Sequence, residues 1–196
     1  MKRRMVLALA PLLLAGCGYN RIQQYDENAQ QAKQQISVQL QRRADLVPNL
    51  VNTVKGYAQH EDAVFTQVAQ ARGALTGAIQ GGDPTQMAAA NAQLTGALGR
   101  LIAVAEAYPQ LKADQSFLRL QDELAGTENR IATARNDYNQ AVQTYNTYIR
   151  IFPQAITAKV TGAQPRTYYE AAPGSETAPT VDFGTKPGAP AAPKTP

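Results

Sequence analysis

The stretch QRRADLVPNLVNTVKGYAQHE, residues 41–61, places two arginines and an aspartate beside a proline within an otherwise helical apolar pattern. Apolar residues recur through it and just upstream in steps of three or four, which is typical of one buried face of an α-helix. They are Ile36, Leu40, Ala44, Val47, Val51, Val54 and Ala58. We therefore predict a long helix here, with one face packed against other helices.

Pro48 stands on the path of this helix. Proline has no N–H, and its ring clashes with the carbonyl four residues earlier, which costs about 3 kcal/mol in a helix interior. The helix can bend at Pro48 and continue, or it can end near Ala44 and restart with Asp45 as its N-cap. The unbroken apolar phase favours the bend, whereas the restart would allow the chain to reverse direction at this point.

Three further helical segments follow. A second apolar stripe covers residues 64–78, and whether residues 58–62 separate it from the first helix stays open. The sequence GGDP at residues 81–84 is a clear break, because two glycines precede an N-cap aspartate and a proline suited to the first helical position. We expect the next helix to begin at this proline and to end before Tyr108-Pro109.

The last long helix, expected from Asp114 to Ile151, has the most regular pattern. Large apolar residues recur every seventh position, at Phe117, Leu124, Ile131, Tyr138, Tyr145 and Phe152. A sustained seven-residue repeat requires a helical partner in a left-handed supercoil. Tyrosines in such a seam carry a polar hydroxyl that we expect near solvent or a partner. The candidate interaction residues are Tyr138, Tyr145, Tyr148 and, further downstream, Phe183.

Residues 163–196 lack helical periodicity and become rich in proline and alanine. Such a segment cannot bury a core, so we expect an extended, disordered tail. Val181-Asp182-Phe183 is an apolar and acidic island within it. Two interpretations of this island stay open: it adds to a groove on the bundle or on a partner, or it is simply tail.

The first 17 residues read as a leader. Lys2, Arg3 and Arg4 precede ten apolar residues, a run shorter than the about 20 that a spanning helix needs. Leu14-Ala15-Gly16-Cys17 then resembles a bacterial lipobox. That resemblance implies cleavage before Cys17, lipidation of its sulfur, and acylation of its new amino group. Several acyl chains give a lasting membrane anchor. An ordinary secretory signal with an incidental cysteine is the alternative.

The fold expected from these patterns is all-α: an antiparallel bundle of three to four long helices. The expected domains are a lipoprotein signal peptide at 1–16, a lipidated cysteine with a short linker at 17–21, a helical bundle at 22–162, and the tail at 163–196. By resemblance to lipoprotein sorting rules, Gly18 after Cys17 favours the outer membrane, with the bundle facing the periplasm.

In combination, several motifs are similar to the signature of the LemA family of bacterial membrane-anchored helical proteins. They are QLQRRADLVPNLVNTVKGYAQHE (39–61), Ala71-Arg72, YPQLKA (108–113), FLRLQDEL (117–124), TENRI (127–131), Ala134-Arg135, Tyr138-Asn139, Tyr145-Asn146 and VDF (181–183). The resemblance implies a helical-bundle domain of unknown biochemical role, and it supplies no catalytic residues. Many members of that family carry an N-terminal membrane helix instead of a lipobox.

The composition offers little material for chemistry. His60 is the one histidine, and no HExxH or Gly-x-Ser-x-Gly motif is present, so neither a metal site nor a hydrolase triad is expected. Three of the 19 basic residues lie in the leader, so the remaining basic residues almost balance the 15 acidic ones. A chain with so small a net charge is not expected to bind nucleic acid. We expect no enzyme activity, no cofactor and no metal.

The charged stretch around Pro48 has two interpretations. Arg42, Arg43, Asp45, Pro48 and Asn49 form either a structural ion cluster that fixes the bend or a docking site for a partner. The first function hypothesis is a membrane-anchored, non-enzymatic scaffold or adaptor of the cell envelope, with lipid bound through Cys17 and a protein partner. The alternatives are a carboxylate-using enzyme of cell-wall metabolism, and a lipoprotein that self-assembles through its tyrosine seam.

Overall fold

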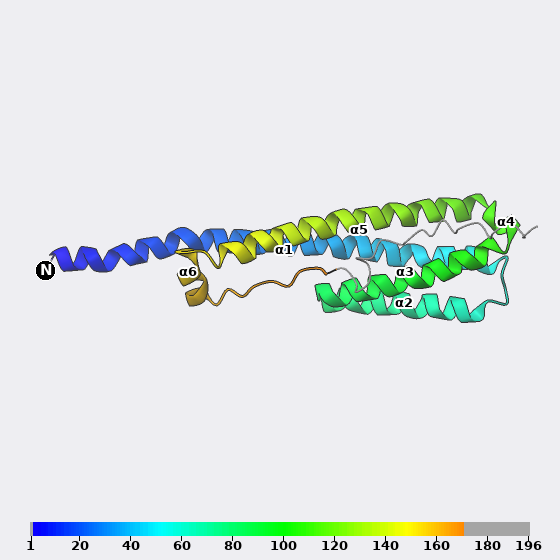
Figure 1. Ribbon diagram of the computed structural model, residues 1–196, viewed down its shortest axis with the longest axis horizontal. Coiled ribbons are helices and arrows are strands. Elements are labelled where there is room, and N and C mark those ends of the chain that lie inside the picture. Colours follow the sequence, from blue (N-terminus) through cyan, green and yellow to red (C-terminus); the bar gives the residue numbers. More distant parts are fainter. Residues whose placement is uncertain (1, 171–196) are drawn as a thin grey trace, which may run out of the picture.

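The computed structural model describes the backbone of residues 2–170 and the side chains of residues 18–170, and over this range it contains helices and no strand. The helices are α1 (Lys2–Lys55), α2 (Asp62–Gly81), α3 (Pro84–Glu106), α4 (Pro109–Lys112), α5 (Gln115–Tyr148) and α6 (Gln154–Thr161). Helix α5 runs back along α1, while α2 and α3 form a hairpin beside the C-terminal half of α1 (Figure 1). The predicted all-α bundle of three to four long helices is confirmed, and the long helices are α1, α2, α3 and α5.

Helix α1 passes through Pro48 without interruption, so the continuing helix is correct and the restart at Asp45 is wrong. The apolar face keeps its phase on both sides of the proline: Leu40 and Ala44 are fully buried before it, and Leu50 and Val54 after it. The chain reverses later. A turn separates α1 from α2, which answers the question left open at residues 58–62.

The seven-residue seam of α5 packs against α1. Its first five members, from Phe117 to Tyr145, are all buried, as the heptad pattern predicts. Phe152 is 81% exposed, because α5 ends at Tyr148 and the seam ends with it. The partner that a seven-residue repeat requires is therefore α1, which lies antiparallel to α5.

The turns that set the helix order follow the local sequence. Between α2 and α3, Gly82 has a φ of +69°, a conformation that glycine adopts without a Cβ clash. The Asp83 carboxylate then caps α3 by accepting from the backbone N of Thr85 at 2.8 Å, and Pro84 takes the first helical position, as predicted. Asp114 caps α5 in the same way.

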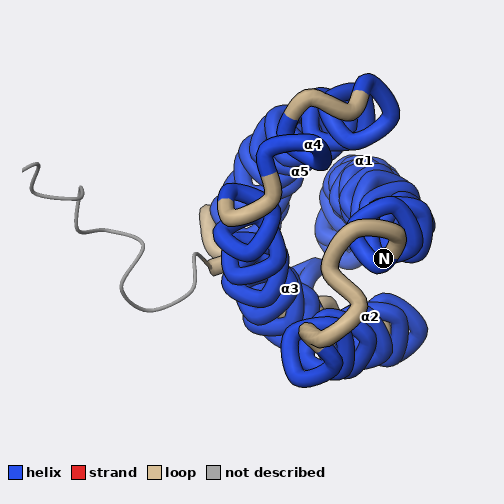
Figure 2. The backbone as a smooth tube through the Cα atoms, turned by 90° about the vertical axis from the view of Figure 1, so that its right-hand side faces the viewer, coloured by secondary structure: helices blue, strands red, loops and turns tan. Residues whose placement is uncertain are grey.

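The two ends of the bundle are built from different helices. Viewed end-on, α5, α3 and α2 are arranged around one side of α1 (Figure 2). Beyond the end of the α2–α3 hairpin, α1 and α5 continue as a pair, and α6 with the extended residues 163–170 occupies their side (Figure 1). The predicted start of the tail at residue 163 is therefore wrong for its first eight residues, which are extended but packed. Residues 171–196, including the Val181-Asp182-Phe183 island, lie outside the described residues.

The expected linker at residues 17–21 is also absent, because α1 runs through these positions as helix. Gly18 is buried where α6 packs on α1: a Cβ on Gly18 would approach Gln154 and Thr157 of α6 at 3.4 and 3.7 Å. Helix α6 thus fixes the start of the bundle next to Cys17. Within the described chain, no helix carries an apolar run that is long enough to cross a membrane.

Candidate functional site

Arg43 of α1 is a charged side chain that is buried among the helices of the bundle. It lies on the same line of α1 as Ile36 and Leu50, seven residues away on either side, and its side chain is 5% exposed. The Arg43 Nη1 atom lies 2.6 Å from Glu128 Oε2 on α5 and donates to Asn91 Oδ1 on α3 at 2.6 Å. One guanidinium therefore joins three helices. Burial lowers the Arg43 pKa and the Glu128 carboxylate opposes that shift, but arginine keeps its proton throughout.

The other members of the predicted cluster do not share this site. Arg42, Asp45 and Asn49 are exposed, and Pro48 is half-buried. Asp45 Oδ1 accepts a hydrogen bond from Gln41 Nε2 at 2.8 Å rather than pairing with Arg42. The stretch is thus divided between the interior and solvent. The seven-residue spacing of Ile36, Arg43 and Leu50 would have identified Arg43 as the buried one.

Arg72 of α2 supplies the hydrogen bond that Pro48 cannot donate within α1. Because proline has no N–H, the carbonyl of Ala44 lacks its usual partner within α1. The Arg72 Nε atom donates to this carbonyl oxygen at 2.8 Å. Ala44 is fully buried, so an unpaired oxygen there would be costly. Arg72 therefore offsets the hydrogen bond that is lost at Pro48, and the same contact joins α2 to α1. The sequence patterns did not reveal this role.

The Arg72→Ala substitution is expected to lower the free energy of unfolding by about 1–3 kcal/mol, since it leaves the Ala44 carbonyl unpaired. In a Pro48→Ala background the loss should be smaller by about 1 kcal/mol, because the restored N–H can bond to that carbonyl. A double-mutant cycle measured by urea unfolding checks this coupling. The same cycle with Arg100→Ala, whose guanidinium bonds to Gln67 at the surface, should be additive, and additivity of the Arg72 cycle would contradict the assignment.

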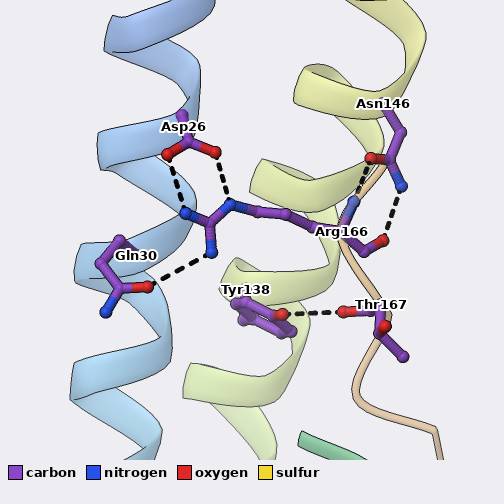
Figure 3. Close-up of polar contacts among 6 residues, drawn as sticks. All are labelled: Asp26, Gln30, Tyr138, Asn146, Arg166 and Thr167. Carbon is purple, nitrogen blue, oxygen red and sulfur yellow. Dashed lines mark hydrogen bonds and ion pairs between the residues drawn. The ribbon is translucent and has the colours of Figure 1, made fainter. Parts of the chain in front are cut away.

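A second polar cluster holds the extended residues 163–170 against α1 and α5 (Figure 3). The Arg166 guanidinium forms a two-bond ion pair with Asp26 of α1, with Nε–Oδ1 at 2.7 Å and Nη2–Oδ2 at 2.8 Å. Its Nη1 donates to Gln30 at 3.2 Å, and its Cζ atom lies 6.0 Å from the Tyr145 ring centroid. Such fork-to-fork pairing fixes orientation as well as charge.

Two asparagines of α5 bind the backbone of the same segment. The Asn146 amide accepts from the N–H of Arg166 at 2.8 Å and donates to its carbonyl at 2.9 Å. The Asn139 amide does the same for Tyr169, at 2.9 and 3.1 Å. Between them, Tyr138 donates its hydroxyl to the carbonyl of Thr167 at 2.7 Å. We call this arrangement of α5 side chains and residues 166–169 the asparagine clamp.

The clamp accounts for the tyrosine seam in a different way from the sequence prediction. Tyr138 and Tyr145 are buried, and they contact the segment at 166–167 of the same chain. Tyr148 is half-buried and meets Tyr25 of α1 edge-on, with ring centroids 5.0 Å apart. The Tyr138 hydroxyl is thus used within the chain, in its bond to the Thr167 carbonyl. Phe183 lies outside the described residues, and so does the side chain of Cys17.

The Asp26–Arg166 pair makes a pH-dependent contribution to stability. The hydrogen bond from Arg166 holds the Asp26 pKa below its ordinary value of 3.8, against the opposing effect of burial. A lowered folded-state pKa means that the contribution is present above pH 3.8 and is lost as the pH falls through the folded value. Asp26→Asn should therefore be less stable than the native chain at pH 6, and the difference should shrink below pH 4. Thermal unfolding of both proteins across this range measures it; a pH-independent difference would contradict it.

The described residues show little that could carry a reaction. They contain no group of three or more His, Cys, Asp and Glu side chains placed to hold a metal ion. The carboxylates with shifted pKa values are Asp26 and Asp114, both lowered, the first by Arg166 and the second mainly by the backbone N–H of Phe117. They belong to opposite ends of the bundle, so they are not a catalytic pair. His60 is exposed in the α1–α2 turn.

Comparison with known proteins agrees with the motif resemblance. The LemA family model matches residues 32–183. Magnetosome proteins MamQ 1 and MamQ 2 of Paramagnetospirillum magneticum are each 30% identical to this chain over an alignment of 198 positions. The alignment covers 88% of this chain and 71% of the relative. Protein LemA of Metamycoplasma hominis is 24% identical over 133 residues, which cover 68% of this chain and 60% of that protein.

Proposed function

The chain belongs to the LemA family, and from that premise we propose that it is a lipid-anchored, non-enzymatic helical scaffold or adaptor of the bacterial cell envelope. Acylated Cys17 would hold it at the membrane, with the bundle on the periplasmic side and the outer membrane as its location. Its work would be to hold a protein partner at a set distance from the lipid surface.

The continuity of α1 carries this proposal. The helix runs without a break from the anchor position to Lys55 at the far end of the bundle. At 1.5 Å per residue, the part after Cys17 is about 57 Å long. A helix that starts at the lipid and is packed along its length against α5 transmits position, because it has no hinge between membrane and bundle. That is a useful property for a spacer and an unnecessary one for a soluble catalyst.

The use of the buried polar groups supports the same proposal. Arg43, Arg72 and Arg166 each bind another segment of the same chain, and together with the asparagine clamp they connect α1 to α2, α3, α5 and the residues after α6. None of these groups is left as an acid or base in a cleft. The carboxylate enzyme alternative needs two close carboxyl groups with displaced pKa values, and the part of the chain from residue 18 to 170 offers no such pair.

Metabolic labelling with a palmitate analogue tests the anchor. The native chain should incorporate the label and sediment with membranes, whereas Cys17→Ser should do neither. A native chain that stays unlabelled and is found in the periplasmic soluble fraction would overturn the anchored scaffold.

Photo-crosslinking in cells tests the adaptor. A photoreactive residue at Asn49 or Asn52 samples the exposed surface of α1 beside Pro48, and Asn136 on the exposed face of α5 is the matched control. We expect one envelope protein to be captured from the Pro48 side only, and only when Cys17 is intact. Turnover of an envelope polymer by the purified chain, abolished by replacing a single carboxylate, would instead establish the enzyme.

A further inference from the structure

The asparagine clamp lies on a line of α5 that continues beyond it. Asn146 and Asn139 are one heptad apart, and the next positions on this line are Ala132, Ala125 and Leu118. In a helix pair held in register by a seven-residue repeat, such a line keeps one orientation toward its neighbours. The surface that binds residues 166–169 therefore has an extension toward the α4 end, and it changes from asparagine to small side chains.

The spacing of the clamp sets a register between helix and extended chain. Seven helical residues rise about 10.5 Å, and three residues of extended polyproline-like chain span about 9–10 Å. The clamp shows this ratio directly, since Asn146 holds Arg166 and Asn139 holds Tyr169. Continued at the same ratio, Ala132 would face residue 172, Ala125 would face 175, and Leu118 would face 178.

A cavity of about 330 Å³ opens where the described segment ends. Tyr169 and Glu170 line one end of it, and its walls come from α3 and α5. The wall residues are Ala88, Asn91, Ala92 and Thr95 of α3, with Glu128, Ile131, Ala132 and Arg135 of α5. Small side chains on both helices leave room for a backbone, in contrast to the asparagines upstream. The cavity is thus a groove in line with the clamp.

Two polar groups at this groove lack partners among residues 18–170. Tyr169 is 3% exposed, and its hydroxyl is buried without a hydrogen-bond partner. Burial raises the Tyr169 pKa to about 12, so the hydroxyl keeps its proton and remains a donor. Arg135 has no carboxylate within ion-pairing distance over the same range, although it lines the same groove. A buried hydroxyl donor such as that of Tyr169 normally has an acceptor.

We propose that residues 171–181 are the occupant of this groove, and that they extend the clamped segment along α3 and α5 to the α4 end of the bundle. The sequence fits the register. An extended polyproline-like chain has three residues per turn, so the residues that follow Arg166 and Tyr169 on the same face are Ala172, Ser175, Ala178 and Val181. Ala172 and Ser175 therefore face Ala132 and Ala125 of α5, and Pro173 and Pro179 fall on other faces.

The length of the segment also fits. From Asn139 to the start of α5 the helix rises about 36 Å, and the 12 residues from 170 to 181 span about 37 Å as polyproline-like chain. Ala178 thereby lies beside Leu118, which is 45% exposed, and Val181 reaches the α4 end of the groove. The LemA family model ends at residue 183, two residues after Val181.

Intramolecular photo-crosslinking in the full chain tests the occupant. A benzoylphenylalanine at position 178 should crosslink to the peptide that contains Leu118, and the same probe at Ala191, beyond the proposed segment, should give no preferred product. Mixing isotopically light and heavy chains separates crosslinks within one molecule from those between copies. Scattered products from position 178, or products only between copies, would overturn the proposal.

Truncation provides an independent measurement. A chain that ends at residue 183 should melt at the temperature of the full chain, whereas a chain that ends at residue 170 should melt several degrees lower and exchange its α3 and α5 amides around the groove faster. Equal melting and exchange of the two truncated chains would contradict the proposal. The inference does not depend on the adaptor function, because these experiments need neither the membrane nor a partner.

Discussion

The Arg43→Ala chain should unfold with a free energy about 2–4 kcal/mol lower than that of the native chain. Breaking a buried ion pair from one side typically costs about 3–5 kcal/mol, since the remaining charge is left buried. Here the remaining carboxylate, Glu128, is 43% exposed and can regain part of its hydration, which lowers the expected cost. Asn91 loses its partner as well. For a domain of this size, the change corresponds to a fall of about 5–15 °C in melting temperature.

Thermal unfolding followed by circular dichroism measures this effect, and the neighbouring residue supplies its control. Arg42 is exposed, so Arg42→Ala should change stability by less than about 0.5 kcal/mol. Replacing Arg43 and Glu128 together by methionine should cost less than Arg43→Ala alone, because no charge is then left unpaired. Equal melting temperatures of Arg43→Ala and Arg42→Ala would show that Arg43 has no structural role. Arg43 would then be a candidate docking residue again.

Removing both amides of the asparagine clamp should release residues 163–170. Asn139→Ala with Asn146→Ala deletes four hydrogen bonds to the segment backbone, each worth about 1 kcal/mol. The summed loss of about 4 kcal/mol is an upper bound, because a detached segment can bond to water. We expect a lower melting temperature and, above all, rapid trypsin cleavage after Arg166, whose side chain is otherwise held by Asp26.

Asn136→Ala is the matched control for the clamp, since Asn136 lies on the exposed face of the same helix. It should melt like the native chain and resist trypsin at Arg166. If the double substitution cleaved no faster than this control, the segment would be held by other contacts, chiefly the buried side chain of Tyr169.

The helices of this protein could be predicted because their patterns are local. The seven-residue seam of α5 and the GGDP break before α3 depend on residues close together in sequence, and both are confirmed. The continuity of α1 through Pro48 followed from apolar phase alone. What made it possible, the hydrogen bond from Arg72, joins residues 28 positions apart and has no local pattern.

The clamp was missed for the same reason. Residues 163–170 have neither helical nor strand periodicity, so composition suggested a tail. Their backbone bonds to side chains of α5, and their one charged anchor pairs with a residue 140 positions away. A pattern was nevertheless available. Asn139 and Asn146 lie one heptad apart, each directly after a buried tyrosine of the seam, which is a regular placement of polar side chains beside the core.

Backbone hydrogen exchange of the native, full-length chain, resolved at Arg166 and Tyr169, is the most direct test of the central claim. That claim is that polar side chains of α1 and α5 hold residues 163–170 against the bundle. The amides of these residues donate to Asn146 and Asn139. We predict that both exchange far more slowly than an unstructured peptide, with protection approaching that of the middle of α5. Exchange of both amides at the rate of an unstructured peptide would contradict the account, since the segment would then be free.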